Sequence, residues 1–313
     1  MIISSSPLQG ITDDVFRSVH HEVFGGIDEY FGPYIRLESH KDAKNSQLKD
    51  ALSPLNKYLN YVPQILSSHS ELILKESERL KELGHKTVNW NLGCPYPMVS
   101  KRNMGAGLLN QPALVKVILE NIMPQMPIEI SIKCRMGLES NEEIFPLIDL
   151  FNTFDLKEII IHARTAKQMY KGYAKPKLVL PLIEQSKHPL VYNGDLNSKK
   201  EILSVQELFE GKIEKFMLGR GLIMKPQLAL LAKGSEVTNL KESLSSFHQK
   251  LINHYLNKYQ GHQLVPKMKG VWEYLAHSFV DSHKVYKLIK KSKSWASYTK
   301  ATDLIFHQFE LDE

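Results

Sequence analysis

Short runs of β-branched and apolar residues alternate with amphipathic stretches from the N-terminus to about residue 232. This alternation is typical of repeated strand–helix units that build a parallel sheet. The clearest predicted strands are residues 61–67, 87–92, 128–134, 158–162, 189–193 and 215–218, and two further strands are expected at 2–7 and 29–35. Eight such units predict an α/β fold of the closed (β/α)8 type, a TIM barrel.

Helix starts follow several of the predicted strands. Residues 68–71 read Ser-His-Ser-Glu and predict a capped start, and Pro112 suits the first turn of another helix. Asn197 and Ser198 precede a predicted helix over residues 199–209. These signals support the assignment of the intervening stretches to helices.

The strand signal ends near Gly234. Residues 240–313 instead show the apolar spacing of amphipathic helices, for example at Ile252 and Tyr255. We therefore predict a barrel domain over residues 1–235, followed by a C-terminal helical domain over residues 240–313.

Positive charge is concentrated in the predicted helical domain. The whole chain carries a formal charge of +6, but residues 241–302 hold eleven Lys and three acidic residues, a net charge of +8. The rest of the chain therefore sums to −2. A solvated helical face has such a composition, and so does a surface that binds the phosphates of a polyanion.

Two features bear on the compartment. No window approaches the roughly 18 uninterrupted apolar residues of a membrane helix, and the first residues show no basic leader. Cys94 and Cys134 are the only cysteines, too few for a disulfide framework. The sequence therefore predicts a cytoplasmic protein without a membrane segment.

Polar residues and glycines stand at the ends of six consecutive predicted strands. In a barrel of this kind the active site lies where strands end and loops begin, so these residues are the first candidates for chemistry. They are Gln64, Asn91, Cys94, Lys133, Arg135, His162, Arg164, Asn193, Gly194, Asp195, Gly219, Arg220 and Gly221.

The last predicted strand leads into Gly219-Arg220-Gly221. A helix that begins there directs backbone N–H groups and the positive end of its dipole toward an anion. Together with Asn193-Gly194, this segment predicts a cradle for the phosphate of a cofactor such as FMN. A plain tight turn is the simpler interpretation.

Cys94 lies between Gly93 and Pro95, just beyond an apolar strand, and its turn should direct the thiol to the mouth of the barrel. A thiol with an ordinary pKa near ~8.5 can donate a proton at neutral pH. Cys134 alternates with Lys133 and Arg135 along a strand, and we expect it to pack behind the sheet as a small hydrophobic residue.

The run Asn91-x-Gly93-Cys94-Pro95, followed by residues 105–109 (Gly-Ala-Gly-Leu-Leu), closely resembles the signature of the tRNA-dihydrouridine synthases. The resemblance extends over most of the barrel. It includes residues 6–8 and 10–13, Gln64, and residues 132–137, 162–165, 193–195 and 218–221, in matching order and spacing.

The resemblance implies a flavin cycle in which NADPH reduces FMN and the reduced flavin passes hydride to C6 of a uracil. Cys94 would protonate C5. The FMN would be held by Pro7, Leu8, Gln64, Lys133, His162, Asn193, Gly194, Asp195, Gly219 and Arg220. The uridine nucleotide would contact Asn91, Arg164, Lys171 and Lys175. The implied partner is tRNA, bound in part by the lysine-rich helices, and we expect no metal and a monomer.

The sequence departs from the family at three places. Residues 6–8 read Ser-Pro-Leu, where the family usually has Ala-Pro-Met. Tyr173 follows Gly172, where a basic residue is frequent, and Asn103-Met104 occupy a loop that is often richer in glycine. The first change should preserve an apolar contact with the flavin. The second bears on the substrate contacts, and the third on which uridine fits.

Two other functions are compatible with parts of the pattern. An FMN barrel that acts on a small molecule, such as a dihydroorotate dehydrogenase-like enzyme, would share Lys133 and the phosphate cradle but would not need the basic helices. An RNA-binding relative without catalytic activity would keep the basic helices but would not need Cys94 and Lys133.

Overall fold

The computed structural model describes residues 1–38, 48–259 and 261–312. Ten parallel strand segments form the sheet, in the order β3-β5-β6-β7-β8-β9-β10-β1-β2-β4. They are β1 (Ile2–Ser5), β2 (Glu29–Phe31), β3 (Ile35–Arg36), β4 (Tyr61–Val62), β5 (Gln64–Leu66), β6 (Thr87–Leu92), β7 (Glu129–Gly137), β8 (Ile159–Thr165), β9 (Leu190–Asn193) and β10 (Lys215–Leu218).

The ten segments make eight barrel strands, because two strands are each interrupted once. β2 continues into β3, and β4 continues into β5 across Pro63, which has no N–H to donate to a neighbour. β2 pairs with β4, and β3 pairs with β5. The first strand pairs with the last through Ile2 opposite Lys215, which closes the ring. The predicted α/β barrel is confirmed.

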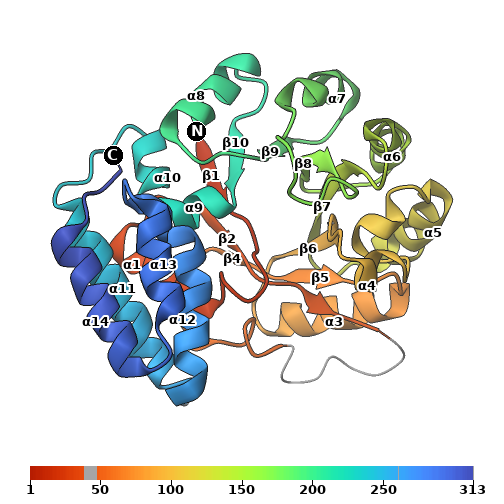
Figure 1. Ribbon diagram of the computed structural model, residues 1–313. Helices are drawn as coiled ribbons and strands as arrows, with labels where there is room; N and C mark the ends of the chain where they lie inside the picture. Colours follow the sequence, from red (N-terminus) through yellow and green to blue (C-terminus); the bar gives the residue numbers. More distant parts are fainter. Residues whose placement is uncertain (39–47, 260, 313) are drawn as a thin grey trace.

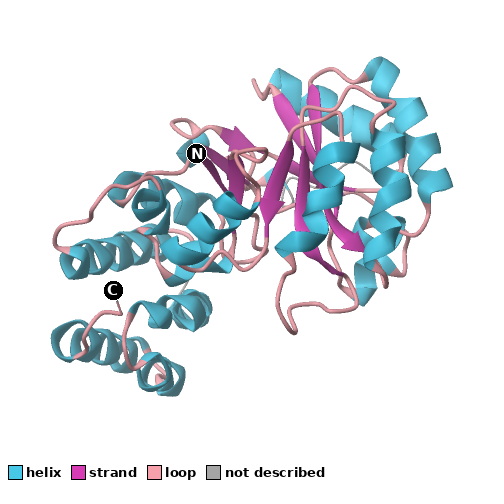
Figure 2. Ribbon diagram, turned by 90° about the horizontal axis from the view of Figure 1, so that it is seen from above, coloured by secondary structure: helices cyan, strands magenta, loops and turns pink. Residues whose placement is uncertain are grey.

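The helices cover the outside of the barrel (Figures 1 and 2). They are α1 (Asp14–Val23), α3 (Ser70–Glu82), α4 (Pro97–Ser100), α5 (Pro112–Ile122), α6 (Ile144–Phe151), α7 (Leu180–Gln185), α8 (Lys199–Leu208), α9 (Arg220–Met224) and α10 (Leu228–Ala232). Among the described residues, no helix is both long and apolar enough to cross a bilayer.

Two of the predicted helix starts are confirmed. Pro112 lies in the first turn of α5, and Ser198 caps α8 by accepting a hydrogen bond from the Glu201 N–H. The predicted cap of α3 is wrong: its N-cap residue is His69, whose side chain makes no capping bond. Ser67 Oγ instead accepts from the His69 N–H at 3.1 Å, which fixes the turn before the helix.

The inside of the barrel is filled near the N-terminal ends of the strands. A small apolar cluster there joins residues of five strands, and an ion triad links the half-buried Lys215 ammonium to Glu29 and to Glu158, the latter at 2.7 Å. The cluster consists of Phe31, Val62, Ile160, Val191 and Met217. This packing closes the floor and leaves the C-terminal ends of the strands open for a site.

Four helices follow the barrel: α11 (Leu240–Leu256), α12 (Gly261–Leu275), α13 (Ser282–Lys291) and α14 (Trp295–Gln308). They gather beside α1 in Figure 1. Their apolar core is continuous with the barrel, because Phe16 of α1 packs with Phe247 and Trp272. The division into two domains near residues 235–240 stays a prediction.

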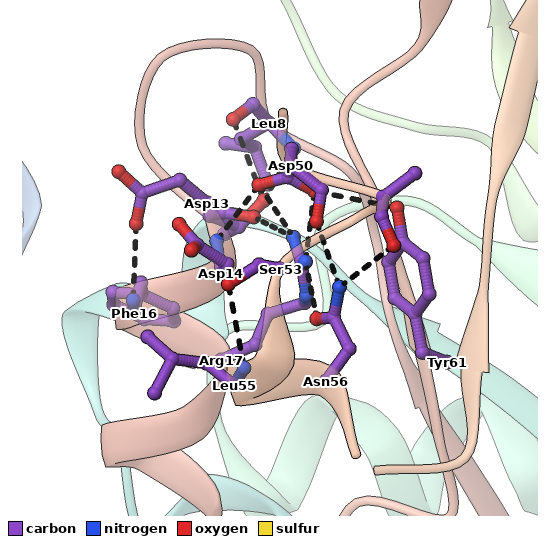
Figure 3. A network of polar contacts seen from close by, with 12 residues as sticks. Leu8, Asp13, Asp14, Phe16, Arg17, Asp50, Ser53, Leu55, Asn56 and Tyr61 are labelled. Atoms are coloured by element: carbon purple, nitrogen blue, oxygen red, sulfur yellow. Dashed lines mark hydrogen bonds and ion pairs between the residues drawn. The ribbon is translucent and has the colours of Figure 1, made fainter. Parts of the chain in front are cut away.

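A buried polar network surrounds Arg17 of α1 (Figure 3). The Arg17 guanidinium, which is fully buried, donates to Asp50 at 2.8 Å and to Asn56 Oδ1 at 2.8 Å, and it lies 4.5 Å from the centre of the Tyr61 ring. The network ties α1 to the chain between α1 and β4. It also holds the Asp13 loop from which α1 starts, through the Thr12 carbonyl.

Residues of the C-terminal helical region form hydrogen bonds and ion pairs with the same loop from outside. Tyr255 donates to Asp13 at 2.7 Å, Lys267 pairs with Asp13 at 2.7 Å, and Lys258 pairs with Asp14 at 2.5 Å. These contacts hold α11 and α12 against the start of α1.

Candidate active site

A cavity of about 530 Å³ opens at the C-terminal ends of the strands. Its volume lies within the usual range for cofactor and ligand sites. The structure brings thirteen of the predicted candidate residues together in its wall. They are Pro7, Leu8, Gln64, Asn91, Cys94, Lys133, Arg135, His162, Asn193, Gly194, Asp195, Gly219 and Arg220. Their individual roles stay predictions.

Cys94 is held in a rigid turn. Asn91 Oδ1 accepts from the N–H groups of Gly93 and Cys94, both at 2.9 Å, and the Ala106 N–H donates to the Cys94 carbonyl at 3.0 Å. Gly105 has a φ of +55°, and a Cβ there would lie 2.9 Å from the Cys94 Cβ. The two separated parts of the signature are therefore parts of one structure that fixes the thiol.

A chain of side-chain amides runs from this turn into the barrel. Asn91 Nδ2 donates to Gln64 Oε1, and Gln64 Nε2 donates to Asn89 Oδ1, each at 2.7 Å. Asn89 in turn donates to Ser131 Oγ at 2.8 Å. Asn89 was not predicted as a site residue, although its alternation with Asn91 along a strand placed both on the inner face. This series of hydrogen bonds orients Gln64 and Asn91, the two predicted site residues in it.

Lys133 lies on the inner face of β7 and donates from Nζ to Asn193 Oδ1 at 2.9 Å. Asn193 Nδ2 donates to the Met217 carbonyl at 2.8 Å, so the lysine is tied to β9 and β10. Burial, with the charge of Arg135 nearby, lowers the pKa of Lys133 to about 7. Among the described residues, no carboxylate pairs with this ammonium, and its hydrogen-bond partner is the Asn193 amide oxygen. A bound anion would therefore stabilise the charged form.

Replacing Lys133 by methionine should stabilise the ligand-free protein at pH 7. The pKa of the folded-state lysine is lower than that of the unfolded chain, so the unfolded state binds more protons between about pH 7 and pH 10.5. The gain in melting temperature should therefore be largest near pH 7 and shrink as pH rises toward 10. Thermal melts across this range, with the exposed Lys57→Met as control, measure it. An equal difference at every pH would contradict the burial argument.

The cavity wall holds three basic side chains, Lys133, Arg135 and Arg220, and two acidic ones, Asp195 and Glu273. The pKa of His162 lies well below its ordinary value because of burial and the surrounding charges of Arg135, Lys133, Arg164 and Arg220. The imidazole is therefore neutral. The excess of basic groups around it favours an anionic ligand.

Asp195 organises the phosphate-cradle segments. Its Oδ1 accepts from Arg220 at 2.9 Å, and its Oδ2 accepts from the Ala174 N–H at 2.7 Å and pairs with Arg164. Close packing joins the cradle to the β9 loop, because a Cβ on Gly221 would lie 2.1 Å from the Leu196 carbonyl oxygen. The two glycine segments predicted to bind phosphate are thus adjacent in space.

The contact of Arg164 with the uridine stays a prediction. The Arg164 side chain is 1% exposed and does not line the cavity. It donates instead to the carbonyls of Lys171 at 2.8 Å and Gly172 at 2.9 Å, and it pairs with Asp195. Arg164 therefore shapes the 171–172 loop. The side chains of Lys171 and Lys175 are exposed outside the cavity wall, and their contact with RNA stays a prediction.

Several cavity residues were not predicted as site residues. Tyr34, Tyr96 and Tyr170 line the wall. The centre of the Tyr170 ring lies 5.3 Å from the guanidinium carbon of Arg135 and 5.1 Å from that of Arg220. Tyr96 was detectable from its place two residues after Cys94.

The helical region contributes a further group to the cavity, comprising Glu273, Tyr274 and His277. No sequence signal places these residues at the barrel mouth, because their position depends on how α12 docks.

Solved structures define the class. The protein resembles an old yellow enzyme homologue from Zymomonas mobilis, with a TM-score of 0.54 and 11% identity over 76% of this chain and 89% of that chain. A variant of NCR from the same organism gives a TM-score of 0.51 and 14% identity over 78% and 90%. This likeness shows the fold alone, that of a (β/α)8-barrel protein.

The chain belongs to the dihydrouridine synthase family, whose model matches residues 4–304. It is 28% identical to the tRNA-dihydrouridine(16) synthase of Pseudomonas syringae pv. tomato over 76% of this chain and 77% of the relative. The enzyme of the same name from Vibrio parahaemolyticus is 24% identical over 98% and 95%. Probable tRNA-dihydrouridine synthase 2 of Bacillus subtilis is 28% identical over 71% and 69%. The resemblance drawn from the motifs is confirmed.

Proposed function

We propose that this protein reduces uridine in tRNA to 5,6-dihydrouridine, with FMN bound in the cavity and NADPH as the reductant. The observation that carries the proposal is the placement of Cys94, in its rigid turn, in the same cavity wall as the Lys133–Asn193 pair and the glycine segments. Membership in the family supports the reaction. The names of the relatives make position 16 the first uridine to examine.

The residues present fit an anionic cofactor. Lys133 and Arg220 supply cationic donors, Asp195 holds Arg220 in place, and Gly219 leaves its backbone uncovered in the cavity wall. An anion at Lys133 would favour the charged ammonium, which burial alone disfavours. Pro7 and Leu8 line the wall just beyond β1, next to β10, and Gln64 lines it from β5; these residues would hold a flat ring.

The chemistry of the bound FMN is the delivery of hydride to C6 of the uracil. Cys94 donates a proton from Sγ to C5, so that the C5=C6 double bond becomes a single bond with one hydrogen added to each carbon. Asn91 holds the backbone of Cys94 and so fixes where the proton is released. Lys133 stabilises negative charge beside its Nζ.

A uridine within folded RNA must swing out of its stack to reach this cavity, at a cost of a few kcal/mol. The face that meets the RNA includes Glu273, Tyr274 and His277 of the helical region. Next to it, α13 and the following segment present six exposed lysines and no acidic residue between residues 284 and 300. They are Lys284, Lys287, Lys290, Lys291, Lys293 and Lys300. We assign this lysine surface to the tRNA backbone.

Substituting glutamine at both Lys287 and Lys291 should weaken tRNA binding and its salt dependence. The two residues lie four apart on α13, on one face of the helix. Each lost phosphate contact lowers the slope of log affinity against log salt by about 0.7–0.9, so a decrease of roughly 1.5 is expected. Titrations at several salt concentrations measure it.

The matched control replaces the exposed Lys199 and Lys200 of α8 by glutamine. A slope changed equally by both pairs would mean that the effect follows net charge and not the lysine surface. Deletion of residues 240–313 is unsuitable as a test, because it would uncover the apolar face of α1 around Phe16.

The lysine surface and the α12 residues at the cavity edge favour RNA over a small-molecule substrate.

Purification and spectroscopy test whether the protein binds FMN. We expect the purified protein to be yellow and to release FMN on denaturation. In the absence of oxygen, NADPH should bleach the flavin absorbance faster than NADH does. A colourless protein that does not take up added FMN would contradict it.

A further inference from the structure

Tyr34 brings its hydroxyl to the thiol of Cys94. The Cys94 Sγ donates to Tyr34 Oη at 3.8 Å, within the longer range of sulfur hydrogen bonds. The half-buried Tyr34 ring packs on an apolar cluster that Cys94 shares with Leu66, Val99 and Met104. Tyr34 also lines the cavity. Packing thus anchors the ring while the hydroxyl stays beside the thiol.

The local backbone explains why Tyr34 points there. Tyr34 lies in the break between β2 and β3, immediately after Gly32 and Pro33. Pro33 has no N–H for strand pairing, and a Cβ on Gly32 would lie 2.1 Å from Tyr61 Oη. The chain therefore leaves the strand for three residues and turns the Tyr34 side chain into the cavity.

The Cys94 backbone is fixed on both sides, by Asn91 at its N–H and by Ala106 at its carbonyl. The remaining freedom of Sγ is rotation about the Cα–Cβ bond. Among the described residues, the Tyr34 hydroxyl is the side-chain group that accepts a hydrogen bond from this sulfur. It therefore selects one orientation of the thiol.

The other charged or titratable groups that face Cys94 are Tyr96 and Arg135, and Arg36 lies near Tyr34. Burial, reinforced by the neighbouring Cys94, raises the pKa of Tyr34, so the hydroxyl keeps its proton at neutral pH. A hydroxyl can both accept and donate. It can therefore accept from a thiol and donate to a thiolate without losing its proton.

We propose that Tyr34 is a positioning residue for the proton donor Cys94, first accepting from the thiol and then donating to the thiolate left after proton transfer. The inference rests on the proposed function. In the step, the Sγ–H bond breaks and the proton bonds to C5, while hydride from reduced FMN bonds to C6. Tyr34 only rotates its O–H, and water later returns a proton to the sulfur.

The test is alkylation of Cys94 by iodoacetamide as a function of pH, with the modified peptide quantified by mass spectrometry. Only the thiolate reacts. Tyr34→Phe keeps the ring but removes the donor, so the pH at which alkylation reaches half its maximal rate should rise by roughly one unit. The rate of dihydrouridine formation in a single turnover should fall roughly tenfold. Tyr58→Phe, at a 79% exposed site, is the matched control and should leave the alkylation profile in place.

A second variant carries 3-fluorotyrosine at position 34, whose more acidic hydroxyl is a stronger donor. It should shift the alkylation profile to lower pH, opposite to phenylalanine. Profiles of both variants that coincide with the unchanged protein, or that move in the same direction, would overturn the inference. If the unchanged protein reduces no uridine, the proposed function fails, and the alkylation profiles still decide whether Tyr34 contacts the thiolate.

Discussion

The Cys94→Ala protein is expected to bind FMN and tRNA but to form dihydrouridine at least about 100-fold more slowly than the unchanged protein. General acids contribute typically 10²–10⁴-fold, and the structure places no second thiol at the cavity among its described residues. The oxidation of NADPH should continue, since it does not require the proton donor. Stopped-flow reoxidation of the reduced flavin by tRNA, with mass spectrometry of the RNA, separates the two half-reactions.

Cys134→Ala is the control for loss of a thiol. Cys134 is fully buried in the apolar core, and burial raises its pKa to about 12, so it does not supply protons at neutral pH. That variant should keep the rate of RNA reduction once its folding is verified. Dihydrouridine formation by Cys94→Ala at the rate of the unchanged protein would remove Cys94 from the mechanism.

Asp50→Ala should lower the free energy of unfolding by about 3–5 kcal/mol, the usual range when one partner of a buried ion pair is removed. It leaves the fully buried Arg17 guanidinium without its carboxylate (Figure 3). It also removes the acceptor of the Asp14 N–H at 2.8 Å, at the start of α1. Denaturant titration gives the change.

The effect should extend beyond stability. Asp13 and Asp14, at the start of α1, anchor the C-terminal helices through Lys267 and Lys258. A looser α1 should therefore raise the KM for tRNA. The fold-change in KM should exceed the fold-change in flavin content. Lys250→Ala, which breaks the exposed pair with Glu22, should cost no more than about 1 kcal/mol. Equal decreases in the free energy of unfolding of the two variants would show that the buried Arg17 network stabilises the fold no more than an exposed ion pair does.

The pattern of apolar runs was sufficient to predict the eight-stranded barrel, because each strand is a separate local signal. Two strands were predicted to end too early: β7 continues to Gly137 and β8 to Thr165, where they pair with each other. Polar residues occupy this stretch, so the sequence shows no apolar run there. Pairing of the backbones, not side-chain character, extends both strands.

Candidate site residues could be predicted where the chain itself fixes them. Cys94 sits in a turn whose glycines are needed for close approach, and strand alternation directs Lys133 inward. Arg164 could not be assigned in the same way, since its burial depends on the carbonyls of a distant loop. Glu273 and His277 reach the cavity only through the docking of α12, which no local pattern encodes.

The most direct test of the proposed reaction is incubation of the purified protein with an unmodified tRNA transcript and NADPH, followed by nuclease digestion and mass spectrometry. A uridine should gain two hydrogen atoms in the presence of the protein and FMN, and this gain should be lost with Cys94→Ala. An unchanged mass at every uridine, with folded and flavin-loaded protein, would contradict it.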